Sequence, residues 1–148
     1  MQASRPSLKD RLPDLFEFVR TLATEIESGE LQESGELAAR IHDFYTVDRM
    51  AVIEIAAPGW REMAGYAQGA TRKHITEALI ALQLLPEYRG APGHLRPLME
   101  WIVLYHDLGK QVIGGQRDSM HAFRSAAMAA RTLPGVGFVA SAAYPAVI

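Results

Sequence analysis

The spacing of apolar residues near the N-terminus predicts an amphipathic helix. Leucine, valine and isoleucine recur there at steps of three and four residues, which places them on one face of a helix. The members of this stripe are Leu8, Leu12, Leu15, Val19, Leu22 and Ile26. Because glycine readily adopts the left-handed conformation that ends many helices, we expect this helix to stop at Ser28 and Gly29.

Further helices are predicted in the middle of the chain. Ser34 is a suitable N-cap for a second helix, since its hydroxyl can accept a backbone N–H of the first turn. The apolar segment 50–57 is expected to be helical as well, although its β-branched residues would also suit a short strand. A longer helix is predicted from about 61 to 85, with a break near Gly69 and an end at Pro86.

The most hydrophobic predicted helix covers residues 95–108. Its centre is apolar on nearly all sides, which is typical of a buried helix. The preceding segment, 86–94, is rich in glycine and proline and is predicted to be a loop. A last helix is expected from about 119 to 133, where small residues permit close packing. With no repeat and no clear hairpin signal, the pattern predicts an all-α protein.

Composition narrows the classes of function. The 148 residues include 15 basic and 17 acidic side chains, for a net charge of −2, so we do not expect a nucleic-acid partner. The absence of cysteine excludes disulfides and thiolate metal sites, and leaves histidine and carboxylates as ligands. The N-terminal sequence lacks the apolar core of a signal peptide and no stretch resembles a membrane span, so we expect a cytoplasmic protein without a membrane partner.

The C-terminal stretch, residues 132–148, carries no charged side chain. Chain ends are usually polar, so this composition needs an explanation. If the tail does not pack into its own core, it would bury its apolar side chains against another chain, and a homodimer formed through it is one expectation. Its two prolines and two glycines argue against a membrane anchor.

A histidine and an aspartate stand side by side at positions 106 and 107, at the end of the buried helix, in the string YHDLGK. Burying an ionised carboxylate without a partner is expensive, so Asp107 needs a cation, either a metal ion or Lys110. His74 and His121 could converge on the same centre if the helices pack antiparallel. Imidazole and carboxylate ligands suit a divalent ion such as Mn, Fe, Ni, Co, Zn or Mg.

These residues resemble the motifs of the HD superfamily of metal-dependent phosphohydrolases. The resemblance is carried by His74, by the string HDLGK at 106–110, and by His121 with the small residues that follow it. It covers residues 74–133 and implies an all-helical bundle, with residues 69–148 as the HD-like core and residues 1–68 as an N-terminal helical extension.

The resemblance also implies roles for individual residues. His74, His106 and Asp107 would bind a divalent metal that activates water against a phosphate ester. Asp107 and Lys110 would act in catalysis, and His121 would hold a second metal or contact the substrate phosphate. Arg124 could clamp the same phosphate through its planar guanidinium, although a solvent-exposed arginine is the simpler interpretation.

One part of the family's pattern is missing. The last metal-binding aspartate of the family lies beyond the helix that His121 begins, and no aspartate or glutamate follows Asp118 here. The sequence therefore predicts an HD-like core that is incomplete at its C-terminal end. Two functions follow, a phosphohydrolase that acts on a phosphorylated small molecule such as a nucleotide or cyclic nucleotide, or an inactive HD module that serves as an interaction or regulatory domain.

The same residues also have explanations that involve no function. Asp107 and Lys110 could form an ion pair at a helix C-terminus, and His74 could be an ordinary surface residue. A second pair, His42 and Asp43, lacks the glycine and lysine of the motif and is predicted to lie on a helix surface.

Overall fold

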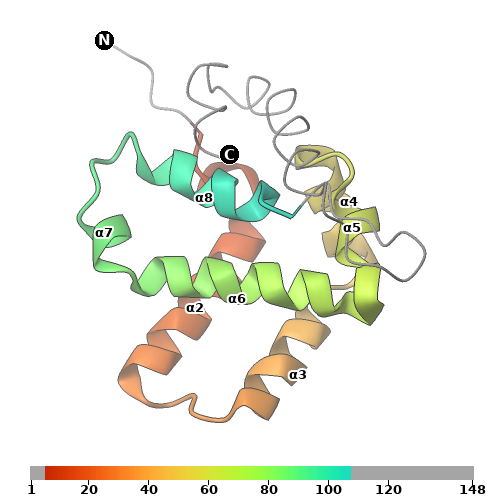
Figure 1. Cartoon of the computed structure of the whole chain (residues 1–148), viewed down its shortest axis with the longest axis horizontal. Helices are drawn as coiled ribbons and strands as arrows, with labels where there is room; N and C mark the ends of the chain where they lie inside the picture. The colour runs from red at the N-terminus through yellow and green to blue at the C-terminus, as the bar shows by residue number, and fades with distance from the viewer. Residues whose placement is uncertain (1–5, 108–148) are drawn as a thin grey trace.

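The computed structural model of the chain describes residues 6–107, without the side chains of residues 66 and 67, and these residues form helices and no strand (Figure 1). The prediction of an all-α fold is therefore confirmed over this range. The elements in chain order are α1 Leu8–Arg11, α2 Pro13–Ser28, α3 Ser34–Phe44, α4 Val47–Ala56, α5 Trp60–Ala64, a 3-10 turn Tyr66–Gly69, α6 Ala70–Leu84, α7 Pro86–Arg89 and α8 Arg96–Tyr105.

The first predicted helix is two helices, α1 and α2. The break falls at Leu12, because Pro13 lacks the N–H that a continuous helix would use and instead occupies the first position of α2. The predicted stripe is buried on both sides of the break, apart from the half-buried Ile26. Gly29 adopts a φ of 83° and ends α2, as the sequence predicts.

The middle helices follow the predicted order with shifted boundaries. Segment 50–57 is helical rather than extended, but α4 begins earlier because Thr46 caps it by accepting the Arg49 N–H at 3.2 Å. The predicted helix 61–85 is broken as expected, with Gly69 at a φ of 90° ahead of α6. α3 begins at Ser34 itself, so the preceding residue is the N-cap and Ser34 is not, contrary to the prediction.

The prediction that residues 86–94 form a loop was wrong in part. α6 ends at Leu84, with the extended residue Leu85 directly before Pro86, as predicted. Pro86 also opens the one-turn helix α7, since proline is well suited to the first helical position. α8, Arg96–Tyr105, lies within the predicted helix 95–108, of which residues 95–107 are described. The predicted helix 119–133 and the uncharged stretch 132–148 lie outside the described residues.

α6 runs through the middle of the described fold, with α8 along one side and α3 on the other (Figure 1). It also packs against α2 and α5. Trp60, Trp101 and Tyr105 are fully buried in the shared core, to which helices before and after residue 68 contribute. The division into an extension and an HD-like core thus remains a prediction. Across residues 6–107, no helix is long and apolar enough to cross a membrane.

Candidate metal centre

His74 stands in the second turn of α6, on the side that packs against α8. Its side chain is 59% exposed. The neighbouring cations point elsewhere: Lys73 pairs with Glu77 at 2.5 Å, and the Arg72 guanidinium lies 5.1 Å from the centre of the Tyr45 ring. His74 is therefore the residue in this part of α6 that turns toward the end of α8.

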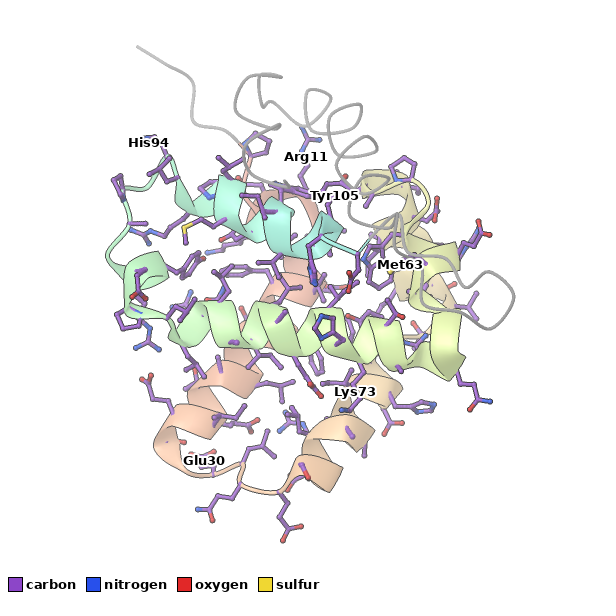
Figure 2. All side chains as sticks on the ribbon, viewed as in Figure 1. Arg11, Glu30, Met63, Lys73, His94 and Tyr105 are labelled. Carbon is purple, nitrogen blue, oxygen red and sulfur yellow. The ribbon has the colours of Figure 1, made fainter. Side chains whose placement is uncertain are left out.

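His106 and Asp107 directly follow the last residue of α8. That end of the helix is fixed by Tyr105, which is fully buried and donates its hydroxyl hydrogen to the carbonyl oxygen of Ala56 at 3.2 Å. Figure 2 shows Tyr105 in the interior, above α6. This anchor brings the His-Asp doublet over the second turn of α6, where His74 is located.

The ligand atoms of the three residues form a small triangle. His74 Nε2 lies 3.2 Å from His106 Nε2 and 3.5 Å from Asp107 Oδ2, and His106 Nε2 lies 3.3 Å from the same carboxylate oxygen. Within residues 6–107, this is the one group of three or more histidine or acidic side chains that could hold a metal ion.

The size of this triangle matches a metal coordination sphere. Two ligands at about 2.1 Å from one ion are about 3.4 Å apart at a tetrahedral angle and about 3.0 Å apart at a right angle. Two of the observed separations, 3.2 and 3.3 Å, fall inside this range, and the third, 3.5 Å, is about 0.1 Å above it. Among the described residues, the triangle would supply three ligands to such an ion.

The tautomer of His106 is set by the backbone. Its Nδ1 lies 2.5 Å from the carbonyl oxygen of Val103, which can only accept, so Nδ1 carries the hydrogen. The Nε2 lone pair of the neutral ring then faces His74 and Asp107. A second hydrogen bond of this kind is the usual way in which proteins orient a metal-binding histidine.

The three side chains differ in burial, so they would approach an ion from different sides. The Asp107 side chain is 10% exposed and the His106 side chain 31%, while His74 remains largely open to solvent. A carboxylate held this deep favours a cation beside it, because little water solvates its charge. Asp107 and the half-buried His106 would hold an ion from the interior side, and His74 would bind it from the surface.

The remaining predicted site residues are not part of this triangle. Lys110, His121 and Arg124 lie outside the described residues, so their proposed roles stay predictions. His42 and Asp43 are exposed on α3, with side chains 79% and 82% accessible, as the sequence interpretation expected. His94 lies at the opposite end of α8 from Tyr105 (Figure 2).

Sequence reasoning missed one functional candidate, the buried Glu100 in the middle of α8. A single acidic residue inside an apolar helix was the available signal, since a charge is rarely buried without partners.

Comparisons of the chain with protein-family models, with curated proteins and with solved structures find no match.

Proposed function

We propose that this chain is a divalent-metal-dependent phosphohydrolase that acts on a phosphorylated small molecule such as a nucleotide or cyclic nucleotide. The observation that carries the proposal is the triangle of His74 Nε2, His106 Nε2 and Asp107 Oδ2, whose edges match the spacing of ligands around one ion. The resemblance of HDLGK and its flanking histidines to HD phosphohydrolases supplies the reaction class.

The residues would share the work in a defined way. A divalent ion bound here would supply a water of lowered pKa and polarise a phosphoryl oxygen. His106 is held ready by its hydrogen bond to the Val103 carbonyl, and Asp107 contributes the negative charge that attracts the ion. His74 is largely exposed and would be the ligand nearest to a phosphate that approaches from solvent.

The experiment is a turnover assay on the purified full chain. A phosphodiester, nucleoside monophosphates and cyclic nucleotides would be offered with Mn, Ni, Co or Mg in turn. We expect hydrolysis with at least one ion, and loss to background in His74→Ala and Asp107→Asn. His42→Ala is the matched control, because it removes a histidine of an exposed His-Asp pair and leaves the triangle intact.

Two results would contradict the proposal. One is the absence of turnover with every ion while circular dichroism shows that the protein is folded. The other is full activity in Asp107→Asn, which keeps the size of the side chain but removes its charge.

One observation favours a second candidate, a non-catalytic interaction module. On α4, Val47 and Ile55 are each 82% exposed and Val52 is 53% exposed, an unusual concentration of apolar side chains on one short helix. A metal-free protein that sediments as a dimer would support this candidate, whereas a metal-loaded monomer would support the enzyme.

A further inference from the structure

Glu100 is a buried carboxylate that the proposed reaction does not use. It lies in the middle of α8 and is 3% exposed. Its Oε1 accepts the backbone N–H of Leu8 at 2.8 Å, and its Oε2 accepts the hydroxyl hydrogen of Tyr88 at 2.5 Å. One side chain therefore joins α8 to the start of α1 and to α7.

The next residue of α8 reinforces the same junction. The indole N–H of Trp101 donates to the carbonyl oxygen of Pro6 at 3.2 Å, and the indole ring is fully buried. The segment 6–8 is thus hydrogen-bonded to two successive residues of α8, across more than ninety positions of sequence.

α8 depends on such contacts for its placement. It has ten residues, no side chain caps its N-terminus, and a helix of this length is marginal by itself. Sliding a helix by one residue moves its end by about 1.5 Å, whereas metal ligands must be placed to within about 0.5 Å. The contacts that fix α8 along its axis therefore decide whether the His-Asp doublet meets His74.

We propose that Glu100 is a positioning residue for the centre formed by His74, His106 and Asp107. By holding segment 6–8 and α7 at fixed points of α8, it sets the register in which the doublet reaches α6. An apolar side chain of similar size would stabilise a core at least as well as a buried carboxylate. The specific contribution of Glu100 is therefore its directional hydrogen bonds, which fix the position of α8. The inference rests on the proposed function, because it assumes that the centre binds a metal ion.

The test measures Co²⁺ binding to the full chain by calorimetry and by the visible absorption of the bound ion, which reports its coordination geometry. Glu100→Leu keeps the volume but removes both acceptors, and we expect the dissociation constant to rise roughly tenfold or more, with a changed spectrum. Glu100→Gln keeps an acceptor for Leu8, so we expect it to restore binding to within roughly threefold of the original chain.

Two further variants keep the test decisive. Tyr88→Phe removes one hydroxyl, which is a mild change, and it tests the positioning role if Glu100→Leu does not fold. We expect Tyr88→Phe to bind Co²⁺ more weakly as well. Leu31→Ala is the stability control, because it removes a buried side chain from the loop between α2 and α3. It should lower the melting temperature and leave the Co²⁺ spectrum unchanged.

The outcomes separate the two proposals. Unchanged Co²⁺ affinity and spectrum in folded Glu100→Leu, or in Tyr88→Phe if only that variant folds, would overturn the positioning role while the metal centre stands. Equal weakening in Leu31→Ala would also overturn it, because loss of stability alone would then explain the effect. Failure of the original chain to bind any divalent ion would overturn the proposed function and this inference with it.

Discussion

The Nε2 atoms of His74 and His106 lie 3.2 Å apart, and the backbone leaves only one of them free to act as a donor. Because Nδ1 of His106 holds its hydrogen against the Val103 carbonyl, Nε2 of the neutral His106 ring is an acceptor. With both rings neutral and no ion bound, His74 therefore turns its Nε2–H toward it. With an ion, both Nε2 atoms must be lone-pair donors to the metal.

This relationship predicts a change of tautomer in His74 on metal binding. In the ion-free protein, nitrogen NMR should show His74 protonated at Nε2, and addition of Zn²⁺ should move that hydrogen to Nδ1. His106 should keep its Nδ1–H in both states. A His74 ring that keeps its Nε2–H in the presence of saturating Zn²⁺ would contradict the centre.

Two threonines of α6 should respond oppositely to the same substitution. Thr71 is buried and its hydroxyl has no partner, so Thr71→Val should raise the free energy of unfolding by about 1 kcal/mol. The hydroxyl of Thr76 is 2.6 Å from that of Tyr45, so Thr76→Val should lower it by about 1–3 kcal/mol. Urea unfolding of both variants measures the change in the free energy of unfolding. Equal changes would contradict the prediction that one hydroxyl lacks a hydrogen bond and the other makes one.

Buried tyrosines should weaken the fold at alkaline pH. Burial raises the pKa of Tyr45 to about 12 and that of Tyr88 to about 12, and the nearby Glu100 carboxylate adds to the effect on Tyr88. A pKa raised in the folded state means that the stabilisation is complete below pH 10, the value for an exposed tyrosine, and is lost as the pH rises toward 12.

By pH 12, the free energy of unfolding should fall by about 1–2 kcal/mol for each of these tyrosines. Urea unfolding over a series of pH values measures it, and ultraviolet absorbance follows tyrosinate formation. Tyr88→Phe should flatten the pH dependence. Titration of both phenols near their ordinary pKa would show that they are solvated.

Replacing glycine by alanine should have opposite effects on stability at two positions, one with a positive φ and one inside a helix. Gly29 has a φ of 83°, where a side chain is strained, so Gly29→Ala should destabilise the protein by about 1 kcal/mol. Gly35 lies in the first turn of α3, and an added Cβ would meet nothing within 4 Å. Gly35→Ala should therefore stabilise the protein by about 0.5 kcal/mol, as thermal unfolding can show.

Periodicity predicted the helices well because burial follows it directly. The stripe of α2 and the inner face of α6 become core, and Gly29 ends its helix for the reason that its conformational freedom suggests. The same periodicity concealed the break at Leu12, because apolar spacing continues across it and only Pro13 marks the start of a new helix. α7 was missed for a related reason, since proline both ends helices and begins them.

The candidate site was accessible to sequence reasoning only in part. The motif at 106–110, together with His74, singled out three residues whose ligand atoms the structure places within 4.8 Å of one another. Metal binding itself stays a prediction. The hydrogen bond to Val103 and the partners of Glu100 were not foreseeable, because they depend on the path of the backbone and on residues that are far apart in sequence.

The junction between segment 6–8 and α8 also imposes an order on assembly. Ribosomes release the N-terminal residues first, yet Pro6 and Leu8 find their partners only after Glu100 and Trp101 have been synthesised. Contacts this distant in sequence form slowly, because the intervening chain must be ordered before they are gained. A nascent chain halted before α8 can form local helices but leaves its first residues undocked, so the packing of α8 against α6 takes shape as a late event of folding.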